Sequence, residues 1–178
     1  MNQTILHTAE DLLNARGLDH LTLPHLTEKL GSEPPFTDDS ALRAALVEKL
    51  FTEHPFTPSR SSLAEHLRET AAGNRRIMLG CRDGARLVSE YFARSTAAMA
   101  VFANSLSFLT GAGFGRHEAA LVLDTLYSYI SGFVATEQIK YGFPRSRESQ
   151  HDREEHFRKA TELIASGARA MKVRSGDA

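Results

Sequence analysis

Apolar residues recur every three to four positions along almost the whole of this chain, and no stretch alternates apolar and polar residues between turn signals. That spacing is the period of the α-helix, whereas a half-buried strand has a period of two. The sequence therefore predicts an all-α fold. The composition agrees, because 42% hydrophobic and 24% charged residues in a chain of 178 are typical of a globular protein and exclude the disordered and collagen-like classes.

The N-terminal segment predicts three helices in a helix-turn-helix-like arrangement. The first is expected over residues 3–16, with a glycine after its last turn. The second follows Thr22, a typical N-cap, carries Pro24 in its first turn and ends before Gly31. The third begins near Asp39, where the helical spacing resumes.

The interval between the second and third helices is short and holds two adjacent prolines. Residues 32–39 read Ser-Glu-Pro-Pro-Phe-Thr-Asp-Asp. Pro35 disfavours helical geometry at Pro34, and a proline inside a helix removes a backbone donor, so no full helix fits there. The interval contains three acids and no base, and residues 1–53 carry nine acids against four bases. This part of the chain is therefore acidic.

The second part of the chain begins after a linker. Residues 54–59 contain two prolines, and they divide the chain into a domain of residues 1–54 and one of residues 55–178. The spacing then predicts helices near residues 62–72, 74–79, 83–92, 95–110, 116–140 and 150–173. The helix over 116–140 is apolar around much of its circumference, which is typical of a helix that is covered on more than one side, by a neighbouring helix or in a dimer.

The sequence also limits compartment and redox chemistry. Cys81 is the only cysteine, which excludes an internal disulfide and a thiolate-rich zinc site. No apolar run approaches the ~20 residues that span a bilayer, and the N-terminus lacks the features of a signal peptide. We therefore expect a cytoplasmic protein without a membrane partner.

Several stretches carry a family likeness. They are residues 5–22, 26–31, 81–86, 106–114 and 131–138, and they include Cys-Arg-Asp-Gly-Ala-Arg and Leu-Ser-Phe-Leu-Thr-Gly-Ala-Gly-Phe. In order and spacing they resemble the tetracycline repressor (TetR) family of transcription regulators, over most of the chain. The resemblance implies a DNA-binding head and a C-terminal ligand-binding and dimerisation domain. It also implies a homodimer, joined by a four-helix bundle of the last two helices of each subunit.

The chain departs from this family where the DNA-reading helix is expected. In the family, a recognition helix and a lysine-bearing turn follow the glycine that here is Gly31. Residues 32–39 are too short, since such a helix needs at least two turns to reach base edges and cations to hold phosphates. The sequence predicts a TetR-like protein that binds a small molecule and has lost its DNA reader. Two alternatives stay open: a functional ligand-responsive repressor that binds operator DNA, and a TetR-like scaffold repurposed as an enzyme on a small metabolite, with Glu137 or a tyrosine as acid or base.

The ligand is expected among the helices between residues 62 and 140. The candidate contacts are polar and aromatic side chains at half-buried positions: Thr70, Asn74, Met78, Tyr91, Asn104, Ser105, Phe108, Tyr129, Phe133 and Glu137. By resemblance, Thr70, Asn74 and Ser105 fall near positions that contact ligand in the family. Each candidate could equally be an ordinary surface polar group or a core aromatic.

The same resemblance predicts no metal and no cofactor. Members of the family that bind tetracycline hold a drug-bound metal ion through a histidine and a carboxylate. The corresponding positions here are Val88 and Thr136, with Glu137 next in the chain. The ligand is therefore expected to be apolar or aromatic, with Phe92 and Phe102 among its walls.

The remaining motifs have ordinary explanations. Residues 111–115 are glycine-rich but follow no predicted strand, so they indicate a helix end and not a phosphate loop. Asp152 and His156 could share a metal ion, yet a solvated helix start explains them. Arg75 and Arg76 could pair with acids or bind a carboxylate ligand, but a solvated cationic face is the simpler expectation. No nucleophile elbow, zinc-protease motif or P-loop occurs, and no catalytic residue is predicted.

Overall fold

The computed structural model describes residues 3–143 and 150–176, and these fold into α-helices with two short 3-10 turns and no strand. The all-α prediction is confirmed. The helices are α1 (Gln3–Arg16), α2 (Leu23–Leu30), α3 (Asp39–Glu53), α4 (Leu63–Leu79), α5 (Gly84–Tyr91), α6 (Thr96–Gly111), α7 (Arg116–Tyr141) and α8 (Gln150–Gly176). The 3-10 turns are Leu18–His20 and Phe92–Arg94.

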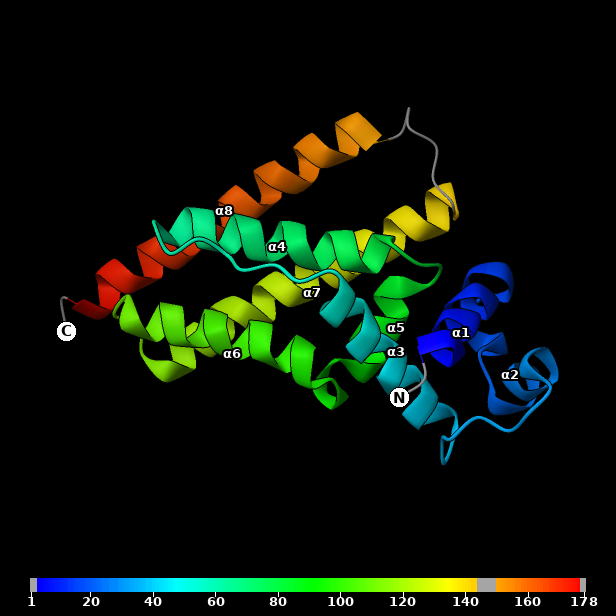
Figure 1. The fold of residues 1–178 in the computed structure, drawn as a ribbon. Helices are drawn as coiled ribbons and strands as arrows, with labels where there is room; N and C mark the ends of the chain where they lie inside the picture. The colour runs from blue at the N-terminus through cyan, green and yellow to red at the C-terminus, as the bar shows by residue number, and fades with distance from the viewer. Residues whose placement is uncertain (1–2, 144–149, 177–178) are drawn as a thin grey trace.

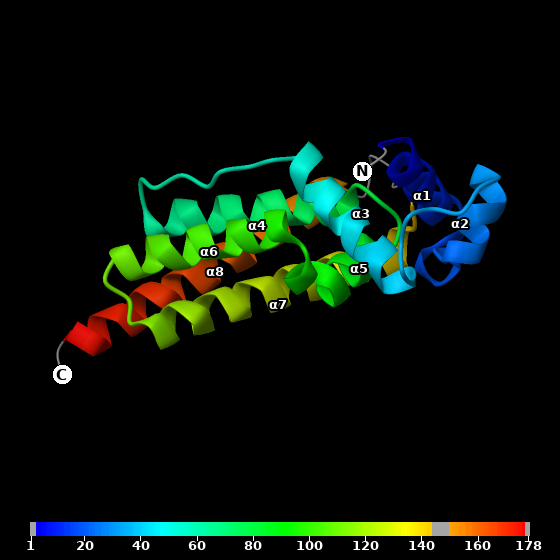
Figure 2. The same cartoon turned by 60° about the horizontal axis from the view of Figure 1, so that its bottom comes forward.

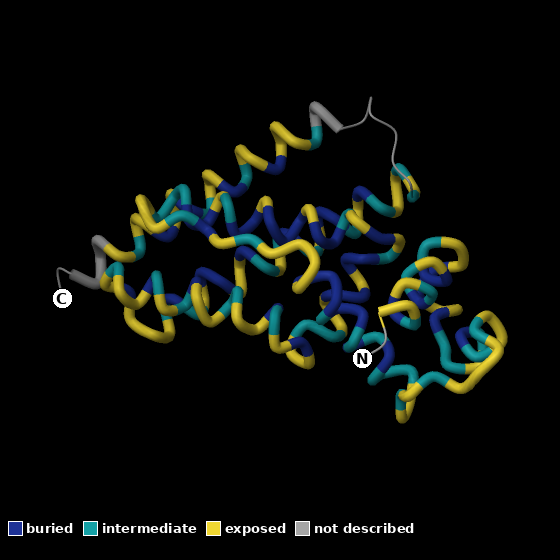
Figure 3. Tube along the Cα trace, in the orientation of Figure 1, coloured by how far each residue is buried: buried dark blue, intermediate teal, exposed yellow. Residues whose placement is uncertain are grey.

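The long helices α4, α6, α7 and α8 form an elongated body, and α1 and α2 lie at one end of it (Figures 1 and 2). Helix α3 joins the two parts, because it contacts α1 on one side and α5 and α6 on the other. Burial follows the same plan, with the inward faces of the helices dark along the length of the body (Figure 3). The core contains fully buried leucines from both parts, among them Leu13, Leu46, Leu67 and Leu126.

Helix α4 differs from its prediction. The sequence indicated two helices, over 62–72 and 74–79, but the structure has one continuous helix from Leu63 to Leu79. Gly73, which lies between the two predicted helices, allows close packing: a Cβ at this position would overlap the ring of Phe56, which lies on the segment that runs beside α4. A buried helical glycine can thus mark a close approach and not an end.

The interval between α2 and α3 contains no helix, as the two prolines predicted. Two of its acids cap the N-termini of helices. The side chain of Asp38 accepts a hydrogen bond from the backbone N–H of Ala41 at 2.7 Å and caps α3, while Asp39 accepts one from Leu23 N–H at 2.7 Å at the start of α2. The Asp39 carboxylate therefore joins the N-terminus of α2 to that of α3, while Asp38 caps α3 itself.

Helix α7 corrects the expectation that no part of the chain is long and apolar enough to span a bilayer. Its 26 residues, Arg116–Tyr141, include a window with a mean hydropathy of 1.3, so α7 is long and apolar enough to pass a length-and-composition test for a membrane span. Its packing accounts for this composition, because α7 contacts α4, α5, α6 and α8. A helix that is covered on several sides needs few polar positions.

Candidate ligand-binding cavity

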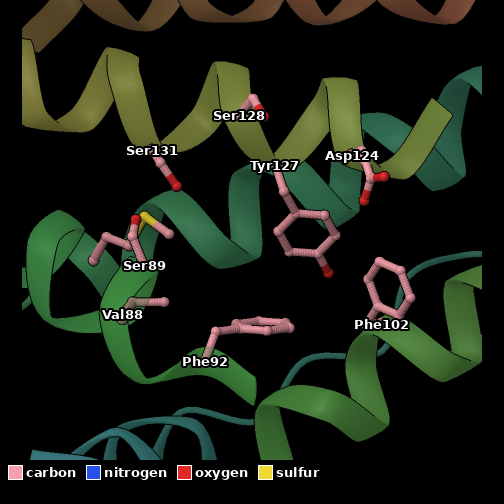
Figure 4. Close-up of a pocket in the computed structure, with 9 residues that line it drawn as sticks. Val88, Ser89, Phe92, Phe102, Asp124, Tyr127, Ser128 and Ser131 are labelled. Atoms are coloured by element: carbon pink, nitrogen blue, oxygen red, sulfur yellow. The ribbon is translucent and has the colours of Figure 1, made fainter. Parts of the chain in front are cut away.

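A cavity of about 520 Å³ lies between α4, α5, α6 and α7 (Figure 4). This volume is in the range of small-molecule sites, ~300–1,000 Å³. The side chains that line it are Met78, Val88, Ser89, Phe92, Phe102, Asp124, Tyr127, Ser128 and Ser131. Of these residues, Ser89, Asp124 and Ser128 are exposed, so the cavity opens to solvent beside α7.

The inner part of the cavity is aromatic. The Tyr127 ring meets the Phe92 ring edge-on with centroids 5.3 Å apart, and it lies 5.8 Å from the Phe102 ring. In Figure 4 the Tyr127 ring projects from α7 into the space between the two phenylalanines. Such a group of rings offers both faces and edges to a flat apolar ligand.

The Tyr127 hydroxyl is a buried polar group beside the aromatic wall of the cavity. Burial raises the pKa of Tyr127 well above its usual value, and the nearby Asn74 side chain opposes that shift. Asn74 is fully buried and donates to the carbonyl of Thr70 at 2.8 Å. Neither the Tyr127 hydroxyl nor the Asn74 carbonyl oxygen has a hydrogen bond of good geometry within the described residues. Of these two residues only Tyr127 lines the cavity, so its hydroxyl is the group that a polar ligand atom or a water molecule could satisfy.

A second buried polar group involves Ser105. The Nδ1 of His66 lies 2.8 Å from the Ser59 carbonyl, which can only accept, so a neutral His66 carries its proton on Nδ1 and accepts from the Ser105 hydroxyl through Nε2 at 3.1 Å. Thr70 lies 3.4 Å from the same hydroxyl, and the Phe108 ring stacks on His66 with centroids 4.0 Å apart. Burial lowers the pKa of His66. Thr70, Ser105 and Phe108 thus lie together, outside the lining of the cavity.

The other predicted contacts lie elsewhere. Met78 lines the cavity, but Tyr91 accepts a hydrogen bond from Arg43 of α3 at 3.4 Å, and Asn104 is exposed on α6. Tyr129 and Phe133 pack against each other and against Phe157 of α8. The structure therefore separates Tyr91, Asn104, Tyr129 and Phe133 from the lining of the cavity.

Glu137 belongs to an ionic cluster between α4, α7 and α8. It is fully buried and pairs with Arg75 of α4, which also contacts Glu154 of α8. The Arg75 guanidinium lies 4.9 Å from the centroid of the Phe157 ring. The expectation of a solvated cationic face is thus wrong for Arg75, because the helix turns this residue into a three-helix junction, whereas Arg76 is exposed.

The residues do not fit the family's drug-bound metal. Val88 lines the cavity where the resemblance places a histidine, and the Thr136 hydroxyl donates to the Gly132 carbonyl of its own helix at 2.9 Å. Within residues 3–143 and 150–176, no three His, Cys, Asp or Glu side chains come together as a metal site. The Asp152 side chain lies outside the described part, so the interpretation of Asp152 and His156 as a solvated helix start stays untested.

Sequence reasoning missed most of the polar rim of the cavity. Ser89, Ser128, Ser131 and Asp124 were not predicted, whereas Phe92 and Phe102 were expected as walls of the site. Asp124, Tyr127, Ser128 and Ser131 recur every three to four residues. This spacing places them on one face of α7, and a polar stripe on an otherwise apolar helix was the available signal.

Comparisons with known proteins agree with this architecture. Residues 54–178 match the family model described as "Tetracyclin repressor-like, C-terminal domain". The chain is 34% identical over 145 residues to the tetracycline repressor protein class A from transposon 1721 of Escherichia coli, a match that covers 76% of this chain and 66% of that protein, just under two thirds of its length.

Solved structures give the same result. The structure of TetR class A in complex with 5a,6-anhydrotetracycline and magnesium superposes with a TM-score of 0.81 at 27% identity, covering 95% of this chain and 98% of that one. BioQ with its double-stranded DNA operator has a TM-score of 0.75 at 22% identity, covering 94% and 96%, which shows a shared fold.

Proposed function

This chain belongs to the tetracycline repressor (TetR) family, and from that premise we propose that it is a homodimeric small-molecule-binding member whose N-terminal segment no longer reads operator DNA. The observation that carries the proposal is the absence of a helix between Leu30 and Asp39. Direct readout in the major groove needs an element that presents several side chains to base edges. An eight-residue coil with two prolines supplies no such element.

The charges of the N-terminal segment support the same conclusion. Of its four cations, Lys49 is buried between Glu10 and Glu53 at 2.6 Å from each. Arg43 donates to the carbonyls of Leu18 and Leu21. Two cations are therefore used inside the fold, and a net charge that is already negative leaves little to neutralise phosphates.

The N-termini of α2 and α3 are also occupied. A helix N-terminus is a ready site for a phosphate, because its backbone N–H groups are unpaired and its dipole is positive there. Asp38 and Asp39 fill these positions at α3 and α2 with their own carboxylates. A DNA phosphate would have to displace a covalently attached anion.

The body of the protein retains what a ligand requires. The cavity between α4 and α7 is open, mostly apolar and lined by aromatic rings, which favours an apolar or aromatic compound. Binding is favoured over catalysis, because the hydrogen-bonded pair Ser105 and His66 that resembles a nucleophile and its base is buried and not part of the lining.

Exposed apolar side chains on α7 and α8 support the proposed dimerisation. Leu121 and Ile139 on α7 and Leu163 on α8 are 50%, 88% and 74% exposed, respectively, in the single chain. Large exposed apolar side chains on adjacent long helices are typical of an interface. We place the partner subunit against the exposed apolar side chains of α7 and α8, as the family bundle implies.

The ligand part is tested by native mass spectrometry of the protein purified from the host that encodes it. We expect a bound compound that is lost in Ser131→Phe, since the new ring would fill the cavity. The matched control is Ser107→Phe, which changes an exposed serine on α6 outside the lining. Retention of the compound by both variants would place the ligand elsewhere and refute the proposed site.

A further inference from the structure

One lining residue of the cavity carries a charge. Asp124 is an acid, and the other lining residues of this cavity are aromatic, aliphatic or serine. No hydrogen bond or ion pair joins Asp124 to another residue of the described chain, although most exposed acids of α4, α5 and α8 pair with a cation on their own helix. The cavity therefore has an uncompensated negative charge at its rim.

The position of Asp124 relates this charge to the aromatic wall. Asp124 precedes Tyr127 by three residues and Ser128 by four, so all three lie on one face of α7. Figure 4 shows Asp124 and Tyr127 projecting from α7 toward the side on which Phe92 and Phe102 lie. A ligand that fills the aromatic part would bring a short substituent within reach of the carboxylate.

This combination selects a ligand class. Aromatic faces attract cations through their quadrupole, and a carboxylate attracts them by charge. The serine hydroxyls can accept hydrogen bonds from an ammonium group. From this arrangement we infer that the cavity is specific for monocationic aromatic compounds, an aromatic body with one protonated amine, whose nitrogen lies at Asp124. The inference rests on the proposed ligand-binding function and narrows its ligand.

Three probes with one ring system test the inference. They are 2-(1-naphthyl)ethylamine, 2-(1-naphthyl)ethanol and 1-naphthylacetate, which are cationic, neutral and anionic near neutral pH. Calorimetry or ring fluorescence gives their dissociation constants for the full chain. We expect the amine to bind about tenfold more tightly than the alcohol, an advantage that added salt reduces, and the acetate to bind most weakly.

Two variants assign the preference to its source. Asp124→Asn removes the charge and is expected to equalise the affinities of the amine and the alcohol. Asp11→Asn removes an exposed acid of α1 far from the cavity and is expected to preserve the preference. Melting temperatures equal to that of the unmodified protein show that both variants keep its fold.

The outcomes separate the two proposals. If the alcohol binds and the amine has no advantage, or if Asp124→Asn keeps the advantage, the inference about ligand charge is overturned and the ligand-binding cavity stands. If none of the three probes binds, the ligand-charge inference is overturned. The native mass spectrum then decides whether the cavity binds any compound.

Discussion

Arg75 and Glu137 form a two-pronged buried ion pair that joins α4 to α7, with Nε–Oε2 at 3.0 Å and Nη2–Oε1 at 2.9 Å. Glu137 has no exposed surface and the Arg75 side chain has 7%. The hydrogen bonds and charges of Glu137 and Glu154 outweigh burial and raise the pKa of Arg75. A bidentate arginine of this kind fixes geometry as well as charge, so α4, α7 and α8 are held in one relative position.

Removing one partner of this pair is expected to destabilise the protein strongly. Arg75→Met removes the bidentate partner of the buried Glu137, whose other cation, Arg153, lies at 3.9 Å, and we expect a loss of about 3 kcal/mol in the free energy of unfolding. Glu154→Gln, at a side chain that is 63% exposed, should cost less than about 1 kcal/mol. Urea denaturation measures both. Equal losses in the two variants would show that burial of the Arg75 pair is not what matters.

The buried His66 predicts a pH dependence. Its pKa is lower in the folded protein than in the unfolded chain, so the unfolded chain binds the proton more readily. The stabilisation is complete above the unfolded pKa, about 6.5, and decreases as the pH falls below it, by at most about 1.4 kcal/mol per pH unit. His66→Gln should flatten the profile between pH 7 and 5, whereas His54→Gln, at an exposed site, should not. If the stability of His66→Gln changed with pH as steeply as that of the unmodified protein, His66 would not be the source of the pH dependence.

Gly73→Ala should destabilise α4 despite the higher helix propensity of alanine. The new methyl group overlaps the Phe56 ring, and overpacking costs about 1–3 kcal/mol. The control is Gly111→Ala, where a Cβ has open space and a change between zero and about 1 kcal/mol of stabilisation is expected. Thermal unfolding of both variants gives the comparison, and a stabilised Gly73→Ala would mean that Phe56 moves freely.

The proposed interface predicts a change of mass in solution. Leu163→Glu puts a charge on the exposed face of α8 and should convert a dimer to a monomer with unchanged helicity. Met99→Glu, at a residue of α6 that is 38% exposed, should leave the dimer intact. Sedimentation velocity separates the two states. A wild-type protein that stays monomeric at high concentration would contradict the homodimer.

The helices were predictable because apolar spacing is a local property. The limits of α1 and the helix-free interval at Pro34 and Pro35 follow from residues close in sequence. The continuity of α4 was not predictable in this way, because the close contact that Gly73 allows is with Phe56, a residue of another segment.

The candidate site was less predictable for the same reason. Which face of α7 meets α5 and α6 determines that Asp124 and Ser131 line the cavity, and spacing along one helix cannot show what packs against it. Likewise, Arg75 and Glu137 are 62 residues apart, so their pairing depends on the tertiary fold alone.

The central claim is that this TetR-family protein does not read DNA, and its binding to DNA tests that claim most directly. The measurement is fluorescence anisotropy with the intergenic DNA that flanks its own gene, titrated with the wild-type dimer at several salt concentrations around 0.15 M. The account predicts no sequence-specific binding, only a weak signal equal to that of a shuffled duplex. Nanomolar affinity for one flanking site, falling steeply with salt and exceeding that for the shuffled duplex, would contradict it.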